Sequence, residues 1–225
     1  MSTLSLALCC EGSTDQHFLP IVIQRTAENV LDKCAKHIVE VLPVEVIEAP
    51  KRKQGRGILE AAIKAAGRHS LIVHTDADNR TYEQAKNQSF VPGYNLVQRT
   101  TRQVCKNLVP IIPIREIEAW MLADHEVLRE VLGTNVSAQN LGLPEKARLV
   151  EANPDPKAAI NKVIAIAYAK RSKRHRKVYW NELYESLAQE IRLERLKEVP
   201  AYKHFEEDLT EVLITLNVIP RRYEF

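Results

Sequence analysis

Residues 4–15 read LSLALCCEGSTD, an apolar run that leads directly into a polar turn. The run from Leu4 to Cys10 predicts a buried β-strand. The turn after it predicts the start of a helix that extends from Thr14 toward Lys36. Two carboxylates, Glu11 and Asp15, lie in this turn, so the segment that starts the fold also carries the first candidate site residues.

Strands and helices alternate through the first half of the chain. Valine-rich and isoleucine-rich runs predict further strands at residues 39–47, 70–75 and 108–114, and strong helix formers predict a helix at 57–68. Pro110 and Pro113 favour an edge position for the last strand or a strand that ends early, because proline cannot donate to the strand ladder. The pattern predicts an α/β fold with a mostly parallel four-stranded sheet flanked by helices.

The second half of the chain has a helical pattern. Helices are predicted at residues 117–132, 145–152, 156–171, 180–197 and 202–217, between glycine and proline breaks. We therefore expect a first domain at residues 1–125, which contains the sheet, and a helical, partly basic extension at 126–225 that packs on it.

Composition excludes several classes of protein. The 225 residues are 45% hydrophobic, enough for a buried core, and the net charge of +3 does not by itself indicate a nucleic-acid binder. The four cysteines contain no C-x-x-C pair, which argues against structural zinc. With neither a secretion leader nor an apolar stretch of about 18 residues, we expect a cytoplasmic protein with no membrane contact.

Acidic side chains follow two predicted strands. Glu11 and Asp15 follow the first, and Asp76 and Asp78 follow the strand at 70–75. Because ligands collect beyond the carboxyl ends of parallel strands, we expect the four carboxylates to meet there. Such a group needs cations, and oxygen ligands favour Mg²⁺ or Mn²⁺.

Each acidic motif also has an ordinary structural reading. In an extended segment Asp76 and Asp78 would share a side, yet D-x-D alone is also a common polar loop, and E-G-x-x-D is also a helix cap. Both motifs follow apolar strands in the same order along the chain, with a helical crossover between them. Together they favour a metal site.

The strand followed by EGSTD, and the later strand followed by DAD, resemble the TOPRIM signature of topoisomerases, bacterial primases and OLD-type nucleases. The segment PIREIEAWMLAD, from Pro113 to Asp124, resembles the TOPRIM-like family named domain of unknown function 4276. The resemblance implies a catalytic domain at residues 1–125, in which Glu11 is a metal ligand or general acid/base and Asp15 is a supporting acid at the metal. Asp76 and Asp78 are implied as metal ligands, with Asp76 also catalytic.

The resemblance extends to Glu116 and Glu118. If the helix has already begun at Glu116, residues two apart face different ways and only one reaches the site. We favour Glu118 as the catalytic residue and place Glu116 second, as a metal ligand. The alternative is a solvated helix start, which acidic residues also favour.

Two basic segments are candidate nucleic-acid contacts. Both could neutralise phosphates, and the second adjoins the aromatic residues Tyr179 and Trp180, but a solvated surface is an equal alternative. The candidate residues are Lys51, Arg52, Lys53 and Arg56 in the first segment, and Lys170, Arg171, Lys173, Arg174, Arg176 and Lys177 in the second.

The leading hypothesis is a metal-dependent nuclease that acts on DNA or RNA. Topoisomerase and primase activities are disfavoured, because the chain has neither a strand-passage domain nor zinc-ribbon cysteines. The resemblance implies defence against phage or plasmid DNA with a separate ABC-type or OLD-type ATPase, since no G-x-x-x-x-G-K-[ST] motif occurs here. The alternatives are an adaptor subunit and a D-x-D transferase, with homo-oligomer formation left open. His74 and Trp120 are interpreted as core residues, with His74 also near the site.

Overall fold

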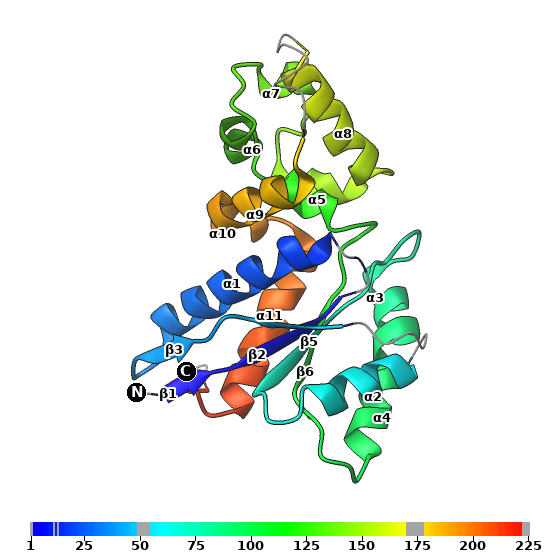
Figure 1. The fold of residues 1–225 in the computed structure, drawn as a ribbon, viewed down its shortest axis with the longest axis vertical. Coiled ribbons are helices and arrows are strands. Elements are labelled where there is room, and N and C mark those ends of the chain that lie inside the picture. The colour runs from blue at the N-terminus through cyan, green and yellow to red at the C-terminus, as the bar shows by residue number, and fades with distance from the viewer. Residues whose placement is uncertain (1, 11, 13, 49–54, 170–177, 222–225) are drawn as a thin grey trace.

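The computed structural model describes residues 2–10, 12, 14–48, 55–169 and 178–221 (Figure 1). Within these residues a four-stranded sheet is formed, all of whose neighbouring strands are parallel. Its order is β4 (Glu45–Ile47), β2 (Leu6–Cys9), β5 (Ser70–His74) and β6 (Leu108–Ile111). The predicted α/β fold with a parallel sheet is confirmed, and the proline-containing strand β6 lies at an edge of this sheet.

The first two predicted strands are each divided. β1 (Ser2–Leu4) pairs in parallel with β3 (Val39–Val41) as a separate two-stranded unit, and β2 and β4 continue beyond the breaks. At Ser5 the backbone N–H donates to Nδ1 of His69, at 3.0 Å, instead of to a strand. Pro43 has no N–H to donate, so the pairing of this segment is interrupted between β3, which pairs with β1, and β4, which pairs with β2.

Both faces of the sheet are covered, and the strands alternate between two cores. Leu6 and Leu8 pack on one side with α1 (Leu19–Cys34) and α11 (Pro200–Thr215). Ala7 and Cys9 pack on the other side with α2 (Gly55–Lys64) and α4 (Val91–Arg99). This period of two, with apolar residues at both phases, is the pattern of a parallel sheet buried on both sides.

Helices α2 and α4 approach each other through glycine. A Cβ on Gly55 would lie 2.8 Å from the backbone nitrogen of Gly93, and a Cβ on Gly93 would lie 2.6 Å from Cβ of Ile58. The contact between these two helices therefore requires residues without side chains.

Several helical bounds differ from the predicted ones. A 3₁₀ turn, η1 (Asp15–His17), precedes α1, which begins at Leu19 with Pro20 in its first turn. The segment 82–99 is helical although no helix was predicted there; it contains α3 (Tyr82–Ala85), the π-helical η2 (Lys86–Phe90) and α4. A capping box between Thr81 and Gln84 starts it.

The predicted helix at 117–132 is two helices, because Asp124 caps the second one. These are α5 (Glu118–Met121) and α6 (His125–Val131). The remaining elements are α7 (Ala138–Leu141), which was not predicted, the 3₁₀ helix η3 (Ala147–Ala152), α8 (Pro156–Ala167), α9 (Trp180–Glu190) and α10 (Leu193–Leu196). Figure 1 shows α5 to α9 stacked beyond one end of the sheet.

The last helix returns to the sheet. In α11 the buried rings of Tyr202 and Phe205 pack on Trp120, which is fully buried as predicted. The Tyr202 hydroxyl is 2.8 Å from Oγ1 of Thr26 in α1. The division into residues 1–125 and 126–225 stays a prediction. Among the residues described, no helix combines the length and apolarity needed to span a bilayer.

Candidate active site

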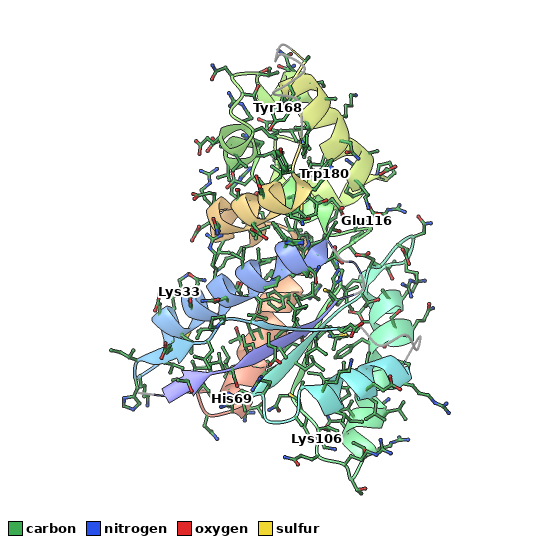
Figure 2. The ribbon with its side chains drawn as sticks, viewed as in Figure 1. Lys33, His69, Lys106, Glu116, Tyr168 and Trp180 are labelled. Carbon is green, nitrogen blue, oxygen red and sulfur yellow. The ribbon has the colours of Figure 1, made fainter. Side chains whose placement is uncertain are left out.

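The acidic segments meet where the sheet changes direction. From β2 the chain crosses through α1 to β3 and β4 on one side, and then through α2 to β5 on the other side of β2. The adjacent carboxyl ends of β2 and β5 form the switch point at which open α/β sheets bind ligands. Figure 2 shows Glu116 beyond this end of the sheet and His69 at the opposite end.

Asp15 is held inside the turn that follows β2. Its Oδ2 accepts the Gly12 N–H at 3.0 Å, and the Thr14 hydroxyl is 3.5 Å from Oδ1. A Cβ on Gly12 would lie 2.6 Å from Oδ2, so the glycine makes room for the carboxylate. The Asp15 side chain is only 9% exposed, which suits the supporting role implied for it.

His74 joins the two acidic segments. Its Nδ1 lies 3.3 Å from Oδ2 of Asp15, and its Nε2 lies 3.3 Å from Oδ1 of Asp76. The imidazole has no exposed surface. The sequence predicts a core or near-site position for His74 without a role in the chemistry. The missed signal is its position two residues before Asp76 at the end of a strand, where alternate side chains share a side.

Asp76 and Asp78 do not share an environment. β5 ends at His74, and Asp78 takes a left-handed backbone conformation with φ 53°. The Asp78 side chain is 73% exposed and lies 3.3 Å from the Arg80 guanidinium. That guanidinium also donates to the backbone oxygens of Asp76 and Ala77. The extended geometry on which the shared side depended does not hold, because the loop curls around Arg80.

Glu118 and Glu116 both lie near the acids of the first two segments. Glu118 is the first residue of α5, is 4% exposed, and accepts a hydrogen bond from the Tyr184 hydroxyl at 2.9 Å. Glu116 precedes the helix, so the helical restriction does not apply to it. Burial raises the pKa of Glu116, and the charges of Glu118 and Asp76 raise it further, against the opposing effect of Lys157.

A small cavity of about 260 Å³ adjoins Glu116. Asp78, Asn79, Arg115 and Asp155 are among the residues that line it. Arg115, like Asp78, has a positive φ, 73°, and its guanidinium contacts the side chain of Asn79. Arg115 thus places one positive charge among the carboxylates of the cavity, next to the candidate site. These carboxylates belong to Asp78, Glu116 and Asp155.

The donor chemistry of these side chains fits a hard divalent ion. Carboxylate oxygens predominate, and Oδ1 of Asp76 is buried and accepts no hydrogen bond of good geometry from the described residues. Across the described parts of the chain, no three His, Cys, Asp or Glu side chains are arranged as a ready metal site. Glu11 lies outside the described residues.

Most of the predicted nucleic-acid contacts also lie outside the described residues. These are Lys51, Arg52 and Lys53 of the first basic segment, and Lys170, Arg171, Lys173, Arg174, Arg176 and Lys177 of the second. Arg56 is described, and it is exposed in the first turn of α2. Exposure is expected for Arg56 both as a phosphate contact and as part of a solvated surface.

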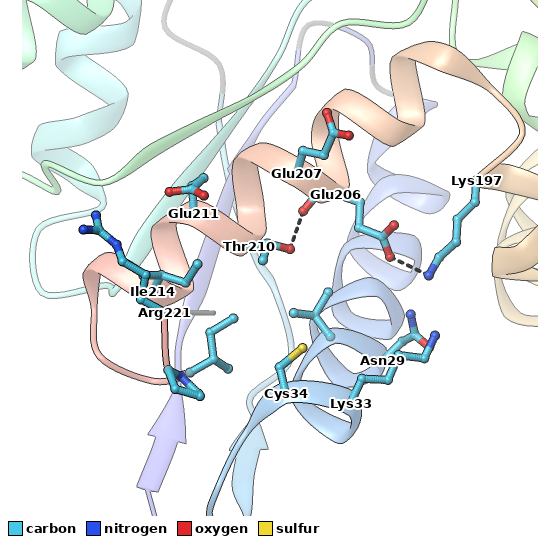
Figure 3. A pocket seen from close by; sticks show the side chains of 13 residues that line it. Asn29, Lys33, Cys34, Lys197, Glu206, Glu207, Thr210, Glu211, Ile214 and Arg221 are labelled. Carbon is cyan, nitrogen blue, oxygen red and sulfur yellow. Dashed lines mark hydrogen bonds and ion pairs between the residues drawn. The ribbon is translucent and has the colours of Figure 1, made fainter. Parts of the chain in front are cut away.

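A separate cavity of about 860 Å³ lies between α1 and α11 (Figure 3). Lys33, Lys197 and Glu206 line part of it, and Lys197 Nζ lies 2.8 Å from Oε1 of Glu206. None of the predicted site residues lines this cavity. The convergence of acids at the switch point therefore remains the better candidate for chemistry.

The comparisons with known proteins agree with the resemblance on one point. The family model described as Domain of unknown function (DUF4276) matches residues 10–210, which include the turn after β2, α5, α9 and most of α11. No curated protein and no solved structure matches the chain.

Proposed function

The chain belongs to the DUF4276 family, and we propose that it is a metal-dependent nuclease that cleaves phosphodiester bonds of DNA or RNA. It acts in the cytoplasm in prokaryotic defence against phage or plasmids, with a separate ABC-type or OLD-type ATPase as partner. Mg²⁺ or Mn²⁺ is the cofactor.

The main support is the meeting of acids from distant segments at one point. The His74 ring lies 3.3 Å from a carboxylate oxygen of Asp15 and 3.3 Å from one of Asp76. The Asp15 side chain is 9% exposed and the Asp76 side chain 28%, and removing two carboxylates from water around one ring is costly unless a cation or proton donors compensate them. A fold stabilised by packing alone would have no reason to bring them together.

Each residue then has a distinct part. Asp76 and Glu11 hold the metal, and Asp15 fixes the turn that carries Glu11. His74 holds Asp15 and Asp76 in position relative to each other. Tyr184 binds one oxygen of Glu118, and the other oxygen of Glu118 faces the reacting groups. A bound divalent ion stabilises the charge that develops on the phosphate during cleavage.

The test is cleavage of labelled single-stranded and double-stranded DNA and RNA by the full chain, with Mg²⁺, Mn²⁺ or a chelator. We expect cleavage only with metal, and a loss on the order of 100-fold or more in Glu11→Gln and in Asp76→Asn. Glu207→Gln, which changes an exposed carboxylate on α11, is the control.

Undiminished metal-dependent cleavage by both site variants would count decisively against the proposal. Nucleic-acid binding that survives chelation, without cleavage under any metal, would favour the adaptor alternative. Turnover of sugar nucleotides would favour the transferase.

A further inference from the structure

A buried tyrosine from the second half of the chain reaches into the candidate site. Tyr184 lies on α9, is 2% exposed, and donates its hydroxyl hydrogen to Oε1 of Glu118 at 2.9 Å. The Trp180 ring packs edge-on against the Tyr184 ring. A buried tyrosine normally needs a partner for its hydroxyl, and here that partner is a candidate catalytic carboxylate.

Helix α9 is also fixed to the other acid-bearing segment. Oε1 of Glu185 lies 2.8 Å from Nδ1 of His17, two residues after Asp15. One turn later, the Ala188 carbonyl accepts a hydrogen bond from Arg25 of α1 at 2.6 Å. Tyr184 and Glu185 are adjacent in α9, so together they fix the start of α5 relative to the segment that follows β2.

The electrostatic surroundings of Tyr184 are those of the acids. Burial raises the pKa of Tyr184, and the charge of Glu118 and the hydrogen bond to it raise the pKa further, with smaller effects of Asp15 and Glu116. The phenol therefore remains protonated and acts only as a donor to Glu118. Its effect on Glu118 is to fix the carboxylate in one orientation.

We propose that Tyr184 is the positioning residue for Glu118 in the cleavage reaction, an inference that rests on the proposed function. A carboxylate with one oxygen tied to a rigid, buried donor has few orientations left. Its other oxygen, Oε2, is then preorganised for the reacting groups. The site is accordingly built from both halves of the chain.

Tyr184→Phe removes only the hydroxyl, and Tyr202→Phe is its matched control. Tyr202 is fully buried and its hydroxyl is also bound, but to Thr26 and not to an acid. We expect kcat for cleavage to fall about 10-fold in Tyr184→Phe, the size of one hydrogen bond to a charged group, with KM unchanged. Tyr202→Phe should change neither constant, although both variants lose some stability.

A double-mutant cycle separates positioning from general support of the fold. Glu118→Asp shortens the side chain by one methylene, so that the carboxylate no longer reaches the Tyr184 hydroxyl. In that background we expect Tyr184→Phe to change kcat by less than about 2-fold, since residues that act as a unit are non-additive. The same cycle, measured by urea unfolding, gives the interaction free energy between Tyr184 and Glu118 and so tests whether the two side chains are in contact.

Each outcome decides one of the two proposals. An unchanged kcat in Tyr184→Phe, or an equal loss in the wild-type and Glu118→Asp backgrounds, would overturn the role of Tyr184 while leaving the nuclease proposal intact. A wild-type chain that cleaves no nucleic acid would overturn the proposed function and, with it, the role of Tyr184.

Discussion

Replacing Asp124 by asparagine tests the contact that joins the turn between α9 and α10 to the turn between α5 and α6. The Asp124 carboxylate is 1% exposed and accepts hydrogen bonds from Nε and Nη2 of Arg192 at 2.7 and 2.6 Å. It also accepts the backbone N–H of Arg192 at 3.2 Å and caps α6 through Val127 N–H at 3.4 Å. Asparagine keeps the size, but it loses the charge and turns an amide donor toward other donors.

The expected loss in unfolding free energy is about 2–3 kcal/mol. Removing one partner of a buried ion pair costs about 3–5 kcal/mol. The Arg192 side chain is 45% exposed, so water can replace part of what it loses, and the cost is reduced accordingly. Against a total stability of about 5–15 kcal/mol, this is a large fraction.

Urea unfolding at pH 7, followed by far-ultraviolet circular dichroism, measures the loss. Glu207→Gln is the control, because the pair of Glu207 with Lys203 is exposed and 3.8 Å long, and we expect it to cost less than about 0.5 kcal/mol. A loss in Asp124→Asn no larger than in this control would refute the reasoning.

The pH dependence gives a second measurement of the same contact. Burial pushes the pKa of Asp124 up, but hydrogen bonds from Arg192 and Val127 outweigh burial and hold the pKa below its usual value. A depressed carboxyl pKa stabilises the fold above the unfolded-state pKa of about 3.9. The difference between wild type and Asp124→Asn should therefore shrink as the pH falls through the folded-state pKa.

Two further outcomes concern packing and titration. Gly93→Ala should destabilise the fold by about 1–3 kcal/mol in urea unfolding, because the added methyl meets Ile58, whereas Asn95→Ala on the exposed side of α4 should stay within about 0.5 kcal/mol. Equal effects of the two changes would contradict the close contact of α2 and α4. Burial raises the pKa of Glu151 to about 7, although hydrogen bonds, including one from the Ala201 N–H, oppose the shift. In this range the folded state binds a proton that the unfolded state has lost, so the free energy of unfolding should fall as the pH rises from about 4.5 to 7. Glu151→Gln should flatten that slope. An unchanged slope in the variant would show that another group is responsible.

Strands with a strong apolar pattern could be predicted from the sequence, but their breaks could not. The runs at residues 4–10 and 70–75 contain enough apolar residues at both phases to be recognised as buried strands. The break at Ser5 depends on His69, which is distant in the sequence, and no local rule locates such a contact. The helix after Thr81 was recognisable by its T-x-x-Q capping box.

The same distinction applies to the candidate site. Asp15 and Asp76 could be named because each follows a predicted strand, and the structure places both beside His74. Tyr184 could not be named, because its approach to Glu118 depends on how α9 packs against α5. The roles of all these residues stay predictions until cleavage is measured.

The position of α11 in the sequence has a consequence for folding. Residues 200–215 cover the face of the sheet to which Leu6 and Leu8 belong, although the two segments are far apart in the sequence. During synthesis α1 can cover part of this face soon after β2 has emerged, but the part that α11 covers stays exposed to water until residues 200–215 have been made. Contacts between such distant segments slow folding, so we infer that docking of this helix is a late step in acquiring the native state.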